Sequence, residues 1–423
     1  MRVLYCTDTY SPQVNGISVV TGLSVSGLTG LGWECAVVAP RAPRAAHDTL
    51  GENAEKDTGA ELVLSLPSIS LPGYSELRLA APSPGPVHEL VNRFRPDLIH
   101  CATELTVGRM GQLAAAHAGI PLVSSYHTDF AGCLDAYGKS WLRGTVSAYL
   151  ARFHQRSRRS YTPSNASRDD LLRLGVPDVE VWGRGVDTQR FHPGRRNSAV
   201  RTSFGLEDRF TFLYVGRLSQ DKRVERVIQA YGLAQQMLPR DVIHLVVAGT
   251  GPQEAVLRAR APRGVTFLGF VDRVNRLPDL YANCDAFLFA STTDTLGLVV
   301  LEAMASGLPV IAAPAGGIRD HLRHDYNGFA YPAGEVGAMA QSMVRLAWEG
   351  GLARRLGKGA RTTAEVLSWR REIERLDLSY REVCDLAAMR SVGQLVGRTV
   401  EPIFTKTAAR GYAAAVQVSE LQT

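Results

Sequence analysis

Residues 291–309 read STTDTLGLVVLEAMASGLP, and this stretch decides the fold of the second half of the chain. Residues 295–297 lack a helical pattern, whereas the apolar residues that follow recur at helical spacing. These are Leu298, Leu301, Met304 and Ala305. Gly307 and Pro309 end the pattern. The stretch therefore predicts a turn followed by a short helix, with Gly297 at the helix start.

Two carboxylates, Asp294 and Glu302, stand on either side of this turn-to-helix junction. The first amides of a helix have no intrahelical partner and carry the positive end of its dipole. The amides of Leu296, Gly297 and Leu298 can therefore receive a phosphate or a sugar hydroxyl. The pattern indicates a sugar-nucleotide site in which one of the two acids meets the sugar and the other the ribose of the same nucleotide. The alternative is that Asp294 only caps the helix and Glu302 is a solvated carboxylate.

The second half also contains a strand-to-helix loop that carries two cations. A strand is expected from Thr211 to Val215, and the loop GRLSQDK follows it at residues 216–222. If the loop bends over one diphosphate, Arg217 and Lys222 can both reach it, and Gly216 leaves room for it. The alternative is a pair of solvent-exposed charges. Further strands alternate with helices after this loop, which predicts a doubly wound parallel sheet.

The first half reads as another strand, glycine loop and helix unit. RVLYCTDTY is followed by a loop with Asn15, Gly16 and Ser18, where a dinucleotide-binding domain would have G-x-G-x-x-G. An NAD enzyme is therefore disfavoured. After little pattern over residues 41–86, short apolar runs end at Cys101 and Tyr126, as in a parallel sheet. His127 follows directly, at the strand end where ligands of such sheets bind. The alternative is a structural histidine.

A basic stretch lies between Lys139 and Arg159. Its apolar residues have helical spacing, and it contains six basic residues and no acid. We expect a basic amphipathic helix that either packs into the first domain with solvated charges or docks on an anionic membrane surface.

Composition sets the outer limits of these expectations. The chain has 423 residues, 45% apolar and 21% charged, which suits a soluble protein of two or three domains. The net charge of +6 favours anionic ligands or a membrane surface, and no nucleic-acid-binding motif is present. Without a signal sequence or an 18-residue apolar run, a cytoplasmic location is expected, possible also at the inner face of the membrane. Six scattered cysteines predict reduced thiols and no metal site.

Several of these motifs together resemble the retaining glycosyltransferases of family four, which have the GT-B fold. The resemblance rests on Asp294 and Glu302, which match a signature of Glu, seven residues and Glu, with Asp in the first place. It rests further on VGRLSQDK, NGIS, SYHTDF and ATELTVG. It implies two doubly wound, Rossmann-like α/β domains that face each other across a cleft. Domain ranges of 1–192 (acceptor side) and 200–368 (nucleotide sugar) are expected. A helix at 369–386 would cross back to the first domain, and the tail 387–423 stays unassigned.

The resemblance also implies site roles and a reaction. Gly16 would face the donor phosphates, the backbone near Val271 would contact the base, and His127, with Glu104 less firmly, would serve the acceptor side. The reaction would move a hexosyl group from a UDP- or GDP-sugar with retention, without a metal or other cofactor. Relatives with NGIS, SYHTDF and STTDTLG-like segments include mannosyl, glucosyl and sulfoquinovosyl transferases that act on lipids.

Three alternatives to this function remain open from the sequence. The acceptor could be a soluble sugar or natural product instead of diacylglycerol, phosphatidylinositol or a similar membrane lipid. A sugar-nucleotide isomerase would use the same fold but convert the donor without a second substrate. A noncatalytic binder would hold the donor without releasing a nucleoside diphosphate.

Overall fold

The computed structural model describes residues 1–423 except 14, 42–58, 72–73, 184, 207–208 and 390–423. The chain divides into two units, Met1–Leu376 and Asp377–Thr423. The second unit is described only for residues 377–389, which are helical, so most of the unassigned tail lies outside the described residues. Within the described part, no helix combines the length and apolar character that crossing a membrane requires.

The first half of unit 1 contains a seven-stranded parallel sheet in the order β3-β2-β1-β6-β7-β8-β9. Its strands are β1 (Arg2–Cys6), β2 (Glu34–Pro40), β3 (Leu62–Leu66), β6 (Leu98–Cys101), β7 (Leu122–Ser125), β8 (Arg159–Thr162) and β9 (Val179–Val181). The stretch 41–86, with its little regular pattern, predicts a surface excursion with short strands, and short strands are present there: β3 pairs in parallel with β2 at the edge of this sheet. The same region contributes an antiparallel hairpin, β4 (Ser68–Leu71) with β5 (Tyr74–Ala80).

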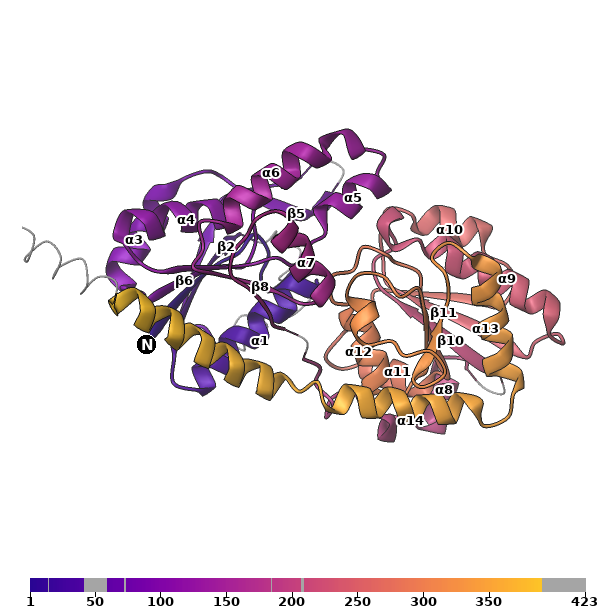
Figure 1. The fold of residues 1–423 in the computed structure, drawn as a ribbon. Helices are drawn as coiled ribbons and strands as arrows, with labels where there is room; N and C mark the ends of the chain where they lie inside the picture. Colours follow the sequence, from indigo (N-terminus) through magenta and orange to yellow (C-terminus); the bar gives the residue numbers. More distant parts are fainter. Residues whose placement is uncertain (14, 42–58, 72–73, 184, 207–208, 390–423) are drawn as a thin grey trace, which may run out of the picture. The chain divides into compact units, whose positions relative to one another are not determined.

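Helices cover both faces of the first sheet (Figure 1). The helices of this half are α1 (Gly16–Gly30), α3 (Pro84–Phe94), α4 (Thr106–Ala118), α5 (Phe130–Ala136), α6 (Arg143–His154) and α7 (Asn165–Arg173). The central strands β1 and β2 are nearly continuous apolar runs, as expected of strands that are buried on both faces.

The expected basic helix from Lys139 to Arg159 is shorter than predicted. A 3₁₀ turn at Ser140–Leu142 leads into α6, which ends at His154, and Arg159 begins β8. Arg159 pairs with Asp178 and Glu180, which are acids from outside the stretch. Pairing with distant acids is invisible in a local charge pattern. The basic side chains therefore do not form one helical face.

The second half of unit 1 contains a six-stranded parallel sheet in the order β12-β11-β10-β13-β14-β15. Its strands are β10 (Phe210–Val215), β11 (Ile243–Ala248), β12 (Val265–Gly269), β13 (Ala286–Phe289), β14 (Val310–Ala312) and β15 (Gly328–Ala330). The helices that pack on it are α8 (Ser198–Ser203), α9 (Val224–Met237), α10 (Glu254–Arg260), α11 (Leu277–Asn283), α12 (Leu298–Ala305), α13 (Val336–Trp348) and α14 (Leu352–Glu365). The predicted α/β class with two doubly wound parallel sheets is confirmed.

Strand order reverses direction once in each sheet, between β1 and β6 and between β10 and β13. Ligands of open parallel sheets bind outside the carboxyl ends of the strands at such a switch point. In the second sheet, the loop after β10 is residues 216–222, and the loop after β13 leads into α12. The two motifs singled out in the sequence therefore flank one switch point.

Chain segments 187–191 and 368–376 connect the two halves and are anchored by buried polar contacts. Trp182 donates its indole N–H to the carbonyl of Glu372 (2.7 Å), and the Glu372 carboxylate accepts from the amide of Gly183 (3.0 Å). On α14, Arg361 donates to the carbonyls of Thr188 (3.0 Å), Phe191 (3.0 Å) and Ala305 (2.6 Å). Arg361 thus fixes the connecting segment to the end of α12.

We expect Arg361→Ala to lower the free energy of unfolding by about 3 kcal/mol, because it leaves three carbonyls without their charged donor. The measurement is urea denaturation followed by circular dichroism. The matched control is Arg354→Ala on the exposed face of the same helix, which should change stability by less than about 0.5 kcal/mol. Equal effects of the two variants would contradict this role.

Candidate active site

Close backbone contact shapes the loop after β10. A Cβ on Gly249 would lie 1.9 Å from the carbonyl oxygen of Gly216, and one on Gly251 would lie 2.4 Å from that of Leu218. The amide of Gly216 donates to Ala248 (3.0 Å). Gly216 itself has φ +154, which disfavours a side chain. The loops after β10 and β11 are therefore locked together, and this fixes the path of residues 216–222.

Lys222 lies at the end of this loop, between two carboxylates. Its Nζ is 2.8 Å from Oδ2 of Asp294 and 3.6 Å from Oδ2 of Asp221. Burial alone lowers the pKa of Lys222, but the charges of Asp294 and then Asp221 outweigh burial, so the pKa is raised. Lys222 is therefore a fixed cation at the switch point. The structure thus brings together two residues that the sequence singled out separately.

Asp221 is a site residue that the sequence reasoning missed. Its carboxylate is buried and accepts hydrogen bonds from the hydroxyls of Ser219 (2.6 Å) and Tyr137 (3.1 Å). Burial raises the pKa of Asp221, but the charge of Lys222 and the two hydroxyls lower it by more, so the pKa lies below the usual value. Asp221 stays ionised and forms a second ion pair with Lys222, beside that of Asp294. The only sequence signal was an acid directly before a lysine.

The start of α12 lies beside this pair. Gly297 is its first flanking residue, with φ +73, and a Cβ there would lie 2.2 Å from Cδ1 of Ile318. The left-handed backbone favours glycine, and a Cβ would also force the end of the Ile318 side chain to move. No side chain caps the helix, so the alternative that Asp294 serves only as a cap is wrong. The amides of Leu298 and Val299 precede the first intrahelical bonds and can receive an anion.

Glu302 lies in the second turn of α12 and is only 1% exposed, so it is not a solvated carboxylate. Its Oε1 accepts from Arg273 Nε (3.1 Å) and Nη2 (2.5 Å), and its Oε2 accepts from the hydroxyl of Tyr281 (3.3 Å). Arg273 follows β12, on the loop where the sequence placed the base contact near Val271. Leu296 is buried and Leu298 half-buried, and both lie at the start of α12.

The other predicted site residues lie at the ends of β1, β7 and β10. Gly16 is the exposed first residue of α1, behind the Asn15 cap, and no atom lies within 4 Å of its missing Cβ. The carbonyl of His127 accepts from the Thr295 hydroxyl (2.6 Å), which joins the end of β7 to the Asp294 loop. Arg217 is half-buried at the start of the loop after β10.

His127 and Glu104 differ in their surroundings. Burial, and then the charge of His154, lowers the pKa of His127 to about 4, so its imidazole is neutral at pH 7. Glu104 is buried, and its Oε1 lies 3.4 Å from Nε2 of His154. Burial raises the pKa of Glu104, against the opposing effect of His154. Glu104 is thus part of an internal polar cluster, whereas His127 is half-buried.

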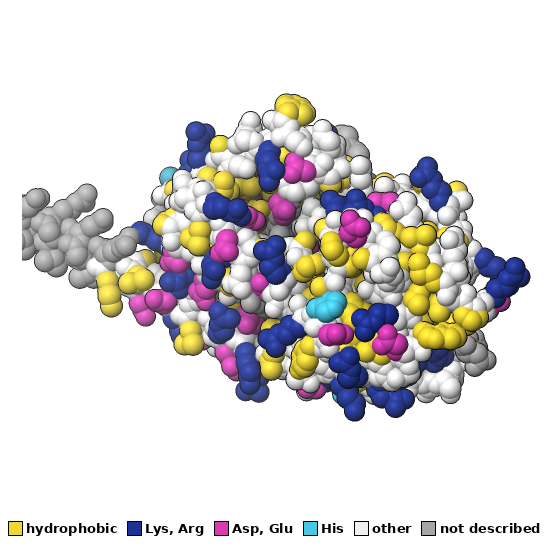
Figure 2. Space-filling view, turned by 45° about the vertical axis from the view of Figure 1, so that its right-hand side comes forward, with side chains coloured by type: hydrophobic (Ala, Val, Ile, Leu, Met, Phe, Trp, Pro, Cys, Tyr) yellow, Lys and Arg dark blue, Asp and Glu magenta, His cyan; other side chains and the backbone are white. Residues whose placement is uncertain are grey.

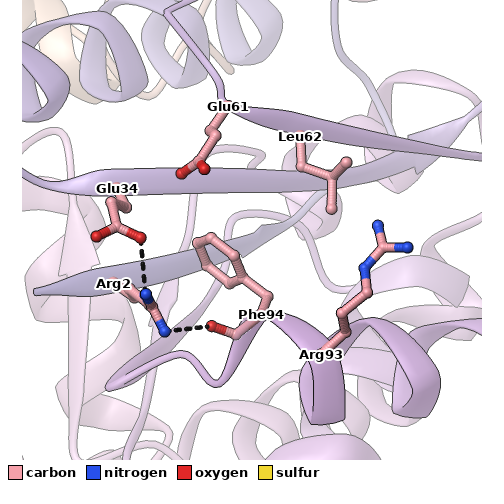
Figure 3. Close-up of a pocket in the computed structure, with 6 residues that line it drawn as sticks. All are labelled: Arg2, Glu34, Glu61, Leu62, Arg93 and Phe94. Atoms are coloured by element: carbon pink, nitrogen blue, oxygen red, sulfur yellow. Dashed lines mark hydrogen bonds and ion pairs between the residues drawn. The ribbon is translucent and has the colours of Figure 1, made fainter.

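A pocket elsewhere in the first half lies at the wrong end of its sheet for this site. It is lined by Arg2, Glu34, Glu61, Leu62, Arg93 and Phe94, which Figure 3 shows around the strand starts. Arg2 donates to Glu34 there (2.7 Å). These residues lie at the amino-terminal edge of the sheet, opposite the edge where ligands of such sheets bind.

Comparison with known proteins agrees with the fold and the motifs. Residues 14–190 match the family model "Glycosyltransferase Family 4", and residues 198–363 match "Glycosyl transferases group 1". A GDP-mannose-dependent alpha-mannosyltransferase of Mycobacterium tuberculosis is 34% identical over 79% of this chain and 85% of its own length. An alpha-monoglucosyldiacylglycerol synthase of Streptococcus pneumoniae is 27% identical over 74% of this chain and 71% of its own.

A solved structure extends this comparison to the fold. Anabaena HepE in complex with UDP-glucose is 22% identical, covers 90% of this chain and 100% of its own, and superimposes with a TM-score of 0.72. The two doubly wound sheets and their loops therefore define a GT-B glycosyltransferase, an enzyme that uses a nucleotide sugar. More specifically, the chain belongs to glycosyltransferase family 4.

The depressed pKa of His127 has a measurable consequence. The imidazole signal of His127 should titrate near pH 4 by NMR, well below the usual 6.5 or so. Since the unfolded chain takes up this proton below about pH 6.5 and the folded chain does not, His127 should weaken folding as pH falls from 6.5 to 4. His127→Gln should reduce that loss. A titration midpoint near 6.5 would contradict the neutral state of His127.

Proposed function

We propose that the enzyme transfers a hexosyl group from a nucleoside diphosphate sugar to a lipid acceptor, with retention of anomeric configuration. The observation that carries this proposal is the 2.8 Å pair of Lys222 and Asp294 at the second switch point, next to the first amides of α12, which no side chain caps. A cation, helix amides and a hydroxyl-accepting carboxylate then lie within one site. A nucleoside diphosphate sugar needs these three groups.

The main barrier to such a transfer is the charge that develops on the departing diphosphate. Lys222, Arg217 and the first amides of α12 would neutralise it, and a preorganised donor of this kind is typically worth about 3 to 4 kcal/mol. Asp294, which replaces the usual Glu, would accept a hydroxyl of the sugar. In this proposal, the protein's own cations perform the task that a metal ion performs in other glycosyltransferases.

A neutral His127 would act as a hydrogen-bonding partner of the sugar or the acceptor and not as a cation. We propose departure and attack on the same face of the sugar, assisted by the leaving phosphate. Gly16 and the backbone near Val271 complete the proposed donor site, at the phosphates and the base respectively.

The similar proteins support particular substrates. The mycobacterial mannosyltransferase is named for GDP-mannose, which makes GDP-mannose the first donor to test. The pneumococcal relative is named for monoglucosyldiacylglycerol, which supports a lipid acceptor. A soluble sugar or natural product is the second candidate for the acceptor. We place the enzyme in the cytoplasm, on the inner face of the membrane when it meets a lipid.

One assay can test both the reaction and the pair of cations, Arg217 and Lys222, that we call the diphosphate clamp. Purified protein is incubated with GDP-, UDP- and ADP-sugars, with and without a membrane lipid extract, and nucleotide release and product mass are followed. Arg217→Ala and Lys222→Ala should each lower kcat at least about a hundredfold, if each cation supplies roughly 3 kcal/mol in the transition state. A chelator should leave the rate unchanged.

The exposed Arg240→Ala serves as the control and should keep wild-type activity. Near-normal rates in both clamp variants would contradict the assignment of Arg217 and Lys222. Donor conversion without an acceptor would indicate an isomerase, and donor binding without nucleotide release would indicate a noncatalytic protein.

A membrane contact can be sought around α6. Trp141, in the preceding 3₁₀ turn, is 79% exposed, and Arg152 and Arg156 are exposed as well. Aromatic rings and cations of this kind favour an anionic membrane surface. On the face shown in Figure 2, by contrast, basic, acidic and hydrophobic side chains are mixed and do not form one basic patch. The proposed contact is therefore local and modest in strength.

Binding to vesicles should rise with anionic lipid content and fall with salt, since the attraction is screened over about 8 Å at physiological ionic strength. The variant with Trp141→Ser, Arg152→Gln and Arg156→Gln should bind roughly 30-fold more weakly, at about 1 kcal/mol for each cation. The matched control carries Trp348→Ser, Arg354→Gln and Lys358→Gln, all on exposed positions of the second half. Equal binding of both variants would favour a soluble acceptor.

A further inference from the structure

The two carboxylate oxygens of Glu302 accept different numbers of hydrogen bonds. Oε1 accepts two N–H groups of Arg273, at 3.1 and 2.5 Å, whereas Oε2 accepts only the hydroxyl of Tyr281, at 3.3 Å. A carboxylate oxygen can accept about two hydrogen bonds. Oε1 is therefore fully used by one guanidinium, and Oε2 keeps capacity for another donor.

The burial of this cluster decides which contact persists when a ligand arrives. Glu302 is 1% exposed and Tyr281 is fully buried, whereas the side chain of Arg273 is 20% exposed. Removing one partner of a buried ion pair is strongly unfavourable, because the remaining charge is left uncompensated. A neutral sugar hydroxyl could not replace the Arg273 charge, but it could add a hydrogen bond at the less occupied oxygen.

Besides its ion pair with Glu302, Arg273 contacts the ring of Phe191. Its guanidinium lies 5.6 Å from the centre of the Phe191 ring, within the range of a cation–π contact. It also follows Val271 by two positions on the loop after β12. One short loop therefore joins the proposed base contact to Glu302, the acid that is left to meet the ribose when Asp294 accepts a hydroxyl of the sugar.

We propose that Arg273 is a positioning residue of the donor site, which fixes Oε1 of Glu302 so that Oε2 remains to accept a ribose hydroxyl. This inference rests on the proposed function, since it assumes that Glu302 meets the ribose of the donor. Arg273 would thereby set the preference for ribonucleotides over their deoxy counterparts. Arg273, a loop residue outside the signature of two acids, would then determine how well Glu302 accepts a ribose hydroxyl.

The test compares nucleotide pairs by isothermal titration calorimetry. The probes are GDP with 2′-deoxy-GDP and 3′-deoxy-GDP, and the corresponding UDP set. For the wild type we expect at least about 10-fold tighter binding of the ribonucleotide than of one deoxy analogue, as for a hydrogen bond to a charged group. In Arg273→Met this ratio should fall below about threefold. The ratio isolates the ribose, because effects on the base and the phosphates cancel.

Arg276→Met is the matched control, because Arg276 lies on the same loop but contacts the ring of Phe204 (5.2 Å). Its ratio should equal that of the wild type. Arg273→Lys keeps the charge with a single donor group and should give an intermediate ratio. If Arg273→Met does not fold by circular dichroism, the Arg273→Lys ratio decides the question.

An unchanged or larger ratio in the Arg273 variants would overturn the inference, since Arg273 would then be structural or would compete with the ribose. A wild type that binds nucleotides without ribose preference would also overturn it. The absence of any nucleotide binding by the wild type would instead contradict the proposed function.

Discussion

The site depends on one ammonium group held between two carboxylates at the switch point of the second sheet. Lys222 is held in place by ion pairs with Asp294 and Asp221, so the proposed donor site has a fixed cation before a diphosphate arrives. This arrangement needs two loops from neighbouring strands, β10 and β13, to come close together. Glycine makes it possible, because the loop after β10 touches the backbone of the next loop at Gly249 and Gly251. A side chain at either position would collide with the backbone of Gly216 or Leu218, in the loop that carries Lys222.

Helix α12 fixes the distance between the two acids of the site. Only eight residues long, it is buried from Val300 to Ala305, so it has little freedom to tilt. Its start is fixed by the left-handed Gly297 against Ile318, and its far end is fixed by Arg361 through the carbonyl of Ala305. A site built on a buried helix is more precise than one built on loops. The backbone of Glu302, the proposed partner of the ribose, is therefore fixed. Only the orientation of its carboxylate remains to be set, and this is the role that we assign to Arg273.

The sequence was sufficient for features that depend on local pattern. Apolar runs predicted both parallel sheets, and the glycine-rich loop and the helix start predicted the positions of Lys222 and Asp294. Contacts between distant residues were not predictable in this way. Arg273 and Glu302 are 29 positions apart, and nothing in the local pattern of either residue specifies the other. The prediction of one basic helix from Lys139 to Arg159 was incomplete for the same reason, because the acids that pair with Arg159 lie further along the chain.

The two sheets share their strand order but use the switch point differently. In the first sheet, Asp8 lies at the corresponding strand end, where it accepts from the hydroxyls of Thr103 (2.6 Å) and Thr106 (2.9 Å) and from the amide of Val107 (2.9 Å). This carboxylate is used to hold the start of α4, and burial raises its pKa. The neighbouring His127 is neutral. Fixed charge is thus concentrated in the second half, where the proposed donor carries its phosphates, and the first half offers an uncharged imidazole. A sugar hydroxyl or a lipid alcohol needs no more than that, and this supports assigning the acceptor to the first half.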